Sequence, residues 1–517
     1  MASYAAIPGE ATGYDSRSPS LASNGRRRHR KENGVAGNAS WASSVINLLN
    51  TIVGAGVLAM PHAMSNMGIV LGTLIILWAG LTAGFGLYLQ TQCARYLDRG
   101  ASSFFALSQI TYPNAAVLFD AAISIKCFGV GVSYLIIIGD LMPGVVRGFG
   151  DPGNASYLVD RHFWVTAFML IVIPLSFLRR LDSLKYTSVI ALVSIAYLVV
   201  LVVYHFAAGD TLAERGNVDV VRAKGVIEVL ASFPVIVFAY TCHQNMFSIL
   251  NEIKDNRHIR TTGVVTASIG TAASIYVLVA ITGYLSFGDN VVGNIVSQYI
   301  PNLASTVGRA AIVVLVMFSY PLQVHPCRAS VDAVSKWRPA SKRAQEFTPA
   351  SGSPSRSSLL NQSSGKVPSR SKPEEMSELR FAVITTSIII LSYIVAMTVS
   401  SLDKVLAYVG STGSTSISFI LPGLFYYKIS SPDSPHHQRL MKEDDDEDYD
   451  GSSSESGDEA GSPITAPGSW RDAWNPKAKG RQYRRDLLRK LSLALAFYGL
   501  CVMVTCLGIN TYLNAQH

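Results

Sequence analysis

Long apolar segments alternate with short polar connections along this chain. Eleven segments approach or exceed the roughly 20 apolar residues that a helix needs to cross a bilayer core of about 30 Å. They cover residues 43–63, 68–90, 115–143, 162–179, 185–206, 226–249, 261–287, 303–325, 379–400, 404–427 and 485–510. The pattern predicts an all-α polytopic membrane protein with eleven transmembrane helices.

The composition also indicates a membrane protein. Hydrophobic residues make up 49% of the chain and charged residues 15%, against about 25% charged residues in soluble domains. The six cysteines lie in or beside the apolar segments without metal-ligand spacing, so neither a disulfide framework nor a metal or other cofactor is expected. The absence of G-x-S-x-G and H-E-x-x-H motifs disfavours an enzyme.

Three polar regions interrupt the apolar part of the chain. Residues 1–39, 329–378 and 428–484 have compositions that predict disordered cytosolic segments, and the last contains the acidic run 443-EDDDEDYD-450. Such segments are candidate sites for cytosolic regulators. Helices 1–5 are then expected in 40–206, helices 6–8 in 207–328, helices 9–10 in 379–427, and helix 11 with a short lumenal C-terminus in 485–517.

Positive charges are concentrated on alternate connections. With the N-terminus in the cytosol, the inward connections carry Arg95, Arg99, Arg179, Arg180, Lys185, Lys254, Arg257 and Arg260, and the outward ones are poorer in basic residues. This positive-inside pattern places Asn154 of 154-NAS-156 on the outer or lumenal face, where a glycan can be attached. Membrane topology and attraction to anionic lipid explain the net charge of +8, so no nucleic-acid partner is expected.

The stretch 50-NTIVGAGVLAMP-61 has two interpretations. Its G-A-G-V-L-A core fits a dinucleotide-binding turn, but that turn requires an acidic residue about 20 positions further on, and residues 61–97 contain neither Asp nor Glu. Alternatively, Gly54 and Gly56 interrupt a membrane helix near its middle. The freed N–H groups would then attract a carboxylate, while freed carbonyls and the Asn50 side chain would bind an ammonium group or a cation. An α-amino acid presents both charges.

On physical grounds alone, the two glycines are equally consistent with close helix packing. A family resemblance favours the interrupted helix. The stretches 50-NTIVGAGVLAMP-61, 133-SYLIIIGDLMP-143 and 238-FAYTCHQNMFSILNEI-253 resemble the amino acid/auxin permease family. The resemblance is closest to the fungal vacuolar amino acid transporters, which are related to the sodium-coupled neutral amino acid transporters.

The resemblance implies a LeuT-type fold, in which ten helices form two inverted repeats of five, one further helix follows, and helices 1 and 6 are broken at the substrate site. It implies a secondary active amino acid transporter of the vacuolar membrane that works by alternating access. The substrate site would comprise Asn50, Thr51, Gly54, Ala55, Gly56, Tyr134, Phe238, Ala239 and Tyr240. Span six departs from this expectation, because it has no glycine at the break and only Pro234 a turn earlier.

Ionisable residues inside membrane spans are costly and are therefore candidate functional groups. His243, Asp140, Lys126 and Glu252 are candidates for proton coupling or gating, and His62 is a further candidate at the outer mouth. Histidine is the side chain that changes charge between an acidic compartment and the cytosol. Structural roles are the alternative: a hydrogen-bonded core histidine, an interfacial cap formed by Asp140, or snorkelling of Lys126 toward the cytosol.

The sequence favours a proton over sodium as the driving ion. Carriers of the LeuT type hold sodium with carbonyls of helix 1 and hydroxyls of helix 8, and 318-FSYPLQVHP-326 offers only Ser319 as a short hydroxyl. Asn50 and Ser319 would then be the remnant of a cation site. We expect an amino acid substrate, a lipid bilayer setting and a transmembrane proton gradient that drives symport toward the cytosol. A sodium-coupled carrier and a transporter-like amino acid sensor are the alternatives.

Overall fold

The structure, a computed structural model, describes residues 37–150, 153, 155–178, 187–336, 376–441 and 476–516. The predicted glycosylation site Asn154, residues 1–36 of the predicted tail, and the larger parts of the two predicted polar loops lie outside the described residues. The described part consists of helices and their connections, with one isolated β-bridge between Ala39 and Ile253.

The first membrane segment is broken. α1 (Trp41–Ile52) begins after Ser40, whose side chain accepts a backbone hydrogen bond of 3.2 Å in the first turn. The helix ends where Val53 takes an extended conformation, and the chain resumes as a 3-10 helix, η1 (Ala55–Ala59), that continues into α2 (Met60–Ser65). The two halves are bent by 48° relative to each other. The helix is therefore interrupted at its glycines, as the family resemblance implies.

A second break divides the sixth segment. α8 (Val226–Ala239) and α9 (His243–Glu252) are separated by residues 240–242. This break contains no glycine. Pro234 lies inside α8 one turn earlier and lacks a backbone N–H, which weakens the helix ahead of the break.

Eight other helices are continuous and form most of the bundle. They are α3 (Ile69–Ala94), α5 (Ala116–Phe149), α6 (Arg161–Ser176), α7 (Thr187–Ala208), α10 (His258–Phe287), α12 (Leu303–Ser335), α14 (Glu378–Thr398) and α18 (Pro476–Gln516). Short helices lie in the connections: α4 (Phe104–Thr111), η2 (Pro113–Ala115), η3 (Ser156–Val159), η5 (Leu212–Glu214), η6 (Gly288–Asn290) and α11 (Ile295–Gln298).

The tenth predicted segment departs from a regular α-helix. α15 (Leu402–Val409) is followed by the π-helical segments η7 (Gly410–Ser414) and η8 (Ser416–Ile420), and then by α16 (Leu421–Ile429). The Thr415 hydroxyl donates a hydrogen bond of 2.6 Å to the Gly410 carbonyl. Because hydroxyls that bond to main-chain carbonyls compete with the regular helical pattern, this Ser- and Thr-rich stretch favours a widened helix.

The described residues include eight helices that are long and apolar enough to cross a membrane, with α8 and α9 counted together as one, and the bent pair of α1 with η1 and α2 would be a ninth. α6 is a shorter apolar helix, and the tenth predicted segment is divided as described. The protein is therefore a helical polytopic membrane protein, while the count of eleven spans and the five-plus-five repeat remain predictions. α12 and α18 extend furthest beyond their predicted limits, since α12 continues to Ser335 and α18 begins at Pro476.

α5 and α12 make the most extensive helix–helix contact, and α10 packs against α1, α2 and α3. Small residues permit close approaches elsewhere in the bundle. A Cβ at Gly410 would lie 2.0 Å from the Pro234 carbonyl oxygen, so α8 and the first π-helical segment touch through their main chains.

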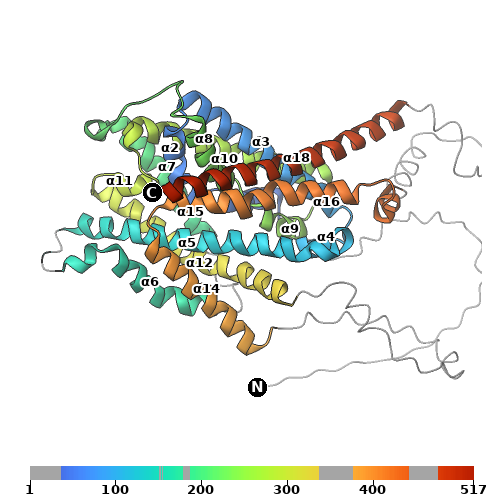
Figure 1. Cartoon of the computed structure of the whole chain (residues 1–517), viewed down its shortest axis with the longest axis horizontal. Helices are drawn as coiled ribbons and strands as arrows, with labels where there is room; N and C mark the ends of the chain where they lie inside the picture. The colour runs from blue at the N-terminus through green and yellow to red at the C-terminus, as the bar shows by residue number, and fades with distance from the viewer. Residues whose placement is uncertain are drawn as a thin grey trace, which may run out of the picture. The chain divides into compact units, whose positions relative to one another are not determined.

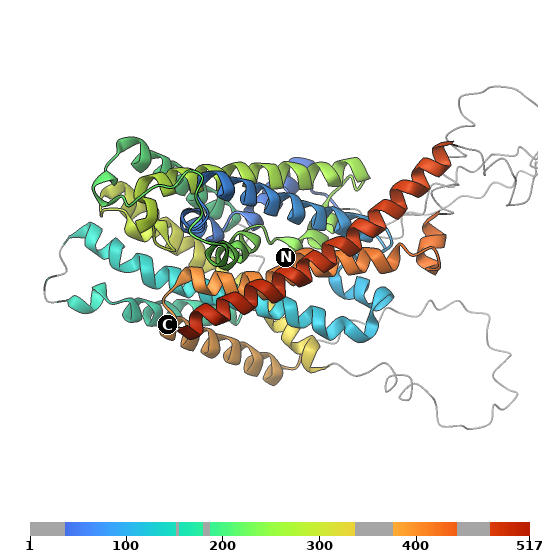
Figure 2. The same ribbon diagram turned by 45° about the horizontal axis from the view of Figure 1, so that its top comes forward.

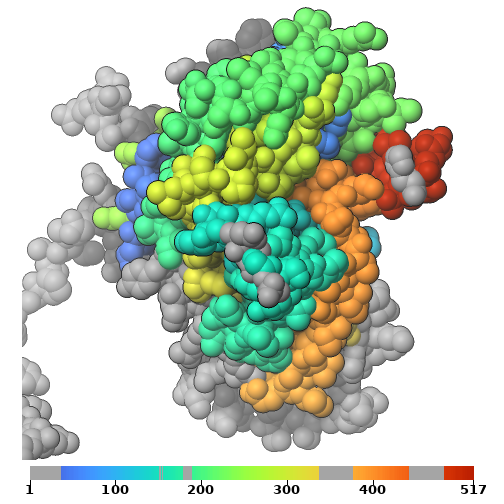
Figure 3. Space-filling view, turned by 90° about the vertical axis from the view of Figure 1, so that its left-hand side faces the viewer, coloured from blue at the N-terminus to red at the C-terminus, as the bar shows by residue number. Residues whose placement is uncertain are grey.

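The helix bundle has two ends (Figure 1, Figure 2). The α4 end holds α4, the start of α1 and the end of α9, where the Ala39 N–H donates a hydrogen bond of 2.8 Å to the Glu252 carbonyl. The α11 end holds α2, α11 and the start of α6. Figure 3 views the α11 end, where segments adjoining α6, α11 and α15 meet.

Candidate functional site

The two helix breaks lie against each other. Gly56 in η1 faces Ala239, the last residue of α8. A Cβ at Gly56 would come within 2.6 Å of the Ala239 Cβ and 2.8 Å of its Cα. Because a larger residue would push η1 away from the end of α8, this close approach requires glycine at position 56.

Tyr276 of α10 connects the ends of both broken helices. Its hydroxyl lies 2.8 Å from the carbonyl oxygen of Ile52 and 2.8 Å from that of Ala239. Both carbonyls belong to the last turn of a helix, where no partner exists within the helix itself. Tyr276 is fully buried, and its ring packs edge-on against Tyr240 with centroids 5.0 Å apart. The single hydroxyl hydrogen of one tyrosine is therefore shared between the two helix ends.

The break in the first segment exposes main-chain groups of both polarities. The Val57 N–H returns to the Gly54 carbonyl at 3.1 Å, so η1 starts a new hydrogen-bonded series at the glycine. The first N–H groups of a helix and the last carbonyls of the preceding one have no intrahelical partner. N–H donors from η1 and carbonyl acceptors from α1 consequently lie close together within residues 50–56. A zwitterionic ligand would use both kinds of group.

A cavity of about 440 Å³ lies beside this break. Ten of the residues singled out from the sequence line it: Asn50, Thr51, Gly54, Ala55, Gly56, Lys126, Tyr134, Phe238, Ala239 and Ser319. They come from both sides of the first break, the end of α8, and the facing surfaces of α5 and α12. The structure thus brings together residues that are far apart in the sequence.

Polar groups in the cavity wall lack hydrogen-bond partners. Within the described part of the chain, the buried side-chain oxygens Oδ1 of Asn50 and Oε1 of Gln244 have no donor. Lys126 lines the same cavity and is only 4% exposed. Buried polar groups are normally paired, and an ionisable residue inside a membrane bundle is costly. Free acceptors and a buried lysine side chain in one cavity are suited to a ligand with an ammonium and a carboxylate group.

The cavity is accessible from the α4 end of the bundle. Asn47, Asn245 and His325 line it and are exposed. Beyond the break, toward the α11 end, Val57 and Met60 are almost completely buried. The chain therefore packs tightly on one side of the break and borders an open polar cavity on the other.

Two predicted residues of the sixth segment point away from the cavity. Tyr240 is fully buried against Gly80, where an added Cβ would lie 3.1 Å from the tyrosine hydroxyl oxygen. His243 is also fully buried, and its Nε2 forms a hydrogen bond of 3.1 Å with the Ala83 carbonyl. Neither side chain belongs to the cavity lining.

Asp140, Glu252 and His62 also lie elsewhere. Asp140 forms an ion pair with Arg161, with Oδ1 3.4 Å from Nε, and so links α5 to the start of α6. Glu252 is exposed at the α4 end. His62 lines a separate cavity of about 230 Å³ whose wall includes Asp403.

Sequence reasoning missed several amide and hydroxyl residues of the cavity. They are Asn47, Thr241, Gln244, Asn245 and Gln323. Gln244 and Asn245 stand within the stretch 238-FAYTCHQNMFSILNEI-253 that carries the family resemblance, so that stretch contained the signal. The site residues predicted from that stretch are instead Phe238, Ala239, Tyr240, His243 and Glu252.

Comparison with known proteins gives consistent results. Residues 37–444 match the family described as "Transmembrane amino acid transporter protein". The chain is 42% identical to vacuolar amino acid transporter 5 of Schizosaccharomyces pombe over 92% of this chain and 95% of that protein. It is also 42% identical to vacuolar amino acid transporter 6 of Saccharomyces cerevisiae over 76% of this chain and 90% of that protein.

A solved structure of similar fold is the inward-facing conformation of Mhp1. The superposition has a TM-score of 0.51 at 9% sequence identity and covers 93% of this chain and 92% of Mhp1. The likeness concerns the fold alone.

Proposed function

The chain belongs to the transmembrane amino acid transporter family, and we propose that it is a secondary active carrier that moves amino acids across the vacuolar membrane. Membership confirms the family resemblance and the prediction of a transporter rather than an enzyme. The names of the two fungal relatives support the vacuolar membrane as its location. The observation that carries the proposal is the polar cavity beside the broken first segment.

In this proposal the substrate binds between the two breaks. Its carboxylate is bound by the free N–H groups at the start of η1 and attracted by Lys126, while its ammonium group is bound by the Asn50 side chain and the last carbonyls of α1. Tyr134 and Phe238 cover the apolar side chain of the substrate. Transport by alternating access then requires the cavity, which is accessible from the α4 end, to close there and open at the α11 end.

We propose that the α4 end faces the cytosol. Basic residues of the described chain are frequent there, among them Arg95 and Arg99 after α3, Lys254 and Arg257 before α10, and Arg484 on α18. The positive-inside rule assigns such an end to the cytosol. The cavity would then be open inward, and the Asp140–Arg161 ion pair would lie on the lumenal side as part of the closed gate.

A proton gradient is the proposed driving force. Ser319 donates its hydroxyl hydrogen to the Leu315 carbonyl at 2.7 Å, which leaves the lone pairs of one hydroxyl oxygen for a cation. Asn50 and Ser319 both line the cavity and would form an incomplete cation site. His243, Lys126, Asp140 and Glu252 remain the candidates for carrying the proton or for gating.

Flux measurements on the purified chain in proteoliposomes test this function. Vesicles with an acidic interior are loaded with a panel of labelled amino acids, and efflux is followed with and without a protonophore, in sodium-free and sodium-containing buffers. We expect efflux that the protonophore abolishes and that does not require sodium. Saturable binding without flux would identify a sensor, and flux that depends on sodium alone would identify a sodium-coupled carrier.

A further inference from the structure

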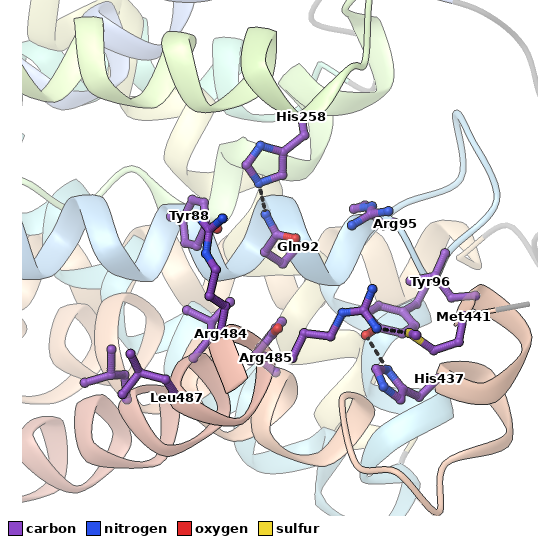
Figure 4. Close-up of a pocket in the computed structure, with 14 residues that line it drawn as sticks. Tyr88, Gln92, Arg95, Tyr96, His258, His437, Met441, Arg484, Arg485 and Leu487 are labelled. Atoms are coloured by element: carbon purple, nitrogen blue, oxygen red, sulfur yellow. Dashed lines mark hydrogen bonds between the residues drawn. The ribbon is translucent and has the colours of Figure 1, made fainter. Parts of the chain in front are cut away.

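A second polar cavity lies at the α4 end, away from the proposed transport site. Its volume is about 390 Å³, and it shares no lining residue with the cavity beside the helix breaks. Its wall comes from the end of α3, the start of α10, the end of α16 with the residues that follow it, and the start of α18. Figure 4 shows the side chains that converge there.

The charged side chains that line this cavity are arginines, and the wall is rich in hydrogen-bond donors. Arg95, Arg484 and Arg485 line it together with His258 and His437, and among the described residues its lining contains neither Asp nor Glu. Guanidinium groups present several N–H donors in a fixed plane and bind phosphate oxygens well. The composition of the wall therefore favours an anionic ligand.

Hydrogen bonds orient the donors around the cavity. The Tyr96 hydroxyl pairs with Nδ1 of His437 at 3.0 Å, and the Gln92 amide pairs with Nε2 of His258. Nη1 of Arg485 lies 2.5 Å from the sulfur of Met441, which is a weak acceptor for a guanidinium group. An oxyanion would be a much stronger partner for this arginine.

The cavity sits where membrane spans end. α3, α10 and α18 are all candidate spans, and the basic residues lie at the ends of these helices. Leu487, Leu488 and Leu491 of α18 form an apolar part of the wall. Leu487 and Leu491 are 43% and 45% exposed, so the apolar wall continues onto the outer surface of α18. An anionic group beside an apolar, lipid-facing surface is the chemistry of a phospholipid.

We propose that this cavity binds the phosphate-bearing headgroup of an anionic phospholipid, with the acyl chains lying along Leu487 and Leu491 of α18. Basic pockets between transmembrane helices on the cytoplasmic side are suited to such headgroups. Tyrosines such as Tyr88 and Tyr96 are favoured at the same depth of the bilayer. A bound lipid would bridge α18 to α3 and α10.

Binding of short-chain phosphatidylinositol 4-phosphate to the full chain in detergent tests the proposal, with phosphatidylcholine of the same chain length as the zwitterionic control. We expect the anionic lipid to bind and phosphatidylcholine not to bind. The double variant Arg484→Gln/Arg485→Gln should weaken binding by about tenfold or more. The control Lys490→Gln removes one charge from the same helix outside the cavity lining and should leave affinity unchanged.

Equal losses in the two variants would indicate diffuse attraction to basic residues and would overturn the proposal, as would unchanged affinity in the double variant. Competition with inorganic phosphate distinguishes a lipid headgroup from free phosphate as the source of the bound anion. Displacement of the lipid only at phosphate concentrations far above that of the lipid supports a lipid site, whereas equally tight phosphate binding assigns the cavity to free phosphate and overturns it.

The acidic run 443–450 follows Met441 closely in the sequence and is the other candidate occupant. In a variant with these carboxylates changed to amides, we expect the lipid to bind at least as tightly as in the native chain. Binding seen only in the amide variant would assign the cavity to the acidic run and overturn lipid occupancy. If Arg484→Gln/Arg485→Gln weakens lipid binding in both the native chain and the amide variant, that result supports the lipid site.

Discussion

The Tyr276 hydroxyl donates a hydrogen bond of 2.8 Å to the carbonyl oxygen of Ile52, at the point where α1 ends. The same hydroxyl reaches the Ala239 carbonyl at the end of α8, so both broken helices depend on one side chain from α10. If the substrate binds between these breaks, Tyr276 is a positioning residue for transport.

Tyr276→Phe should therefore reduce amino acid flux strongly. The change keeps the ring but removes the one hydroxyl hydrogen that two buried carbonyls share, at a cost of about 1–3 kcal/mol in the free energy of unfolding. Tyr284→Phe is the matched control, because Tyr284 is fully buried on the same helix and its hydroxyl bonds to the Asp219 N–H at 2.9 Å. Thermal unfolding and flux are measured for both variants. Similar melting temperatures with normal flux in Tyr276→Phe would refute the positioning role.

Gly56→Ala should impair transport by pushing the two breaks apart. The added methyl group would lie 2.6 Å from the Ala239 Cβ, and overpacking of this kind costs about 1–3 kcal/mol. Gly270→Ala on α10 is the control, since an added Cβ there meets no atom within 4 Å. Flux is compared at equal amounts of folded protein in the membrane. Normal flux in Gly56→Ala would show that the breaks tolerate separation and would argue against a site formed by their contact.

The position of the first break could be predicted from sequence more completely than the position of the second. Gly54 and Gly56 stand in the middle of an apolar segment, where glycine weakens a helix, and the chain does leave the α-helix there. At the second break the residues 240–242 include no glycine, and only the family resemblance indicated an interruption.

Side-chain directions after a break could not be predicted. Tyr240 was expected to cover the substrate, but the rotation of the chain beyond α8 places its ring against Gly80 and Tyr276. The amide residues of the cavity were missed for a related reason. Gln244 and Gln323 are neither ionisable nor periodic in the sequence, so only the meeting of α9 and α12 identifies them as cavity residues.

The predicted helix limits were wrong where helices extend past their apolar portions. α12 continues through polar residues to Ser335, and α18 begins at Pro476 in a stretch rich in Lys and Arg. Hydropathy reports the thickness of the membrane rather than the length of a helix, so it underestimates helices that project beyond the bilayer.

Lys126→Met should raise the KM for amino acids by about tenfold, which corresponds to about 1.4 kcal/mol of lost substrate attraction. The methionine side chain is of similar length but carries no charge. Because an ionisable group in a bundle interior is costly, its removal should leave the melting temperature unchanged or higher. Lys428→Met, at an exposed position near the end of α16, is the control. A normal KM in Lys126→Met would exclude Lys126 from attracting the substrate carboxylate. A normal proton requirement in the same variant would exclude it from proton coupling.

His243→Gln should weaken the dependence of flux on lumenal pH while preserving flux at a fixed pH. The glutamine amide can donate to the Ala83 carbonyl, as Nε2 of His243 does at 3.1 Å, but it cannot take up a proton. Since His243 lies directly after the second break yet outside the cavity lining, protonation there would act on the position of α9 rather than on the substrate. Rates are measured across a series of lumenal pH values, with the exposed His162→Gln at the α11 end as the control. Superimposable pH profiles for the native chain and His243→Gln would leave His243 with a purely structural role and would leave Lys126, Asp140 and Glu252 as the candidate proton carriers.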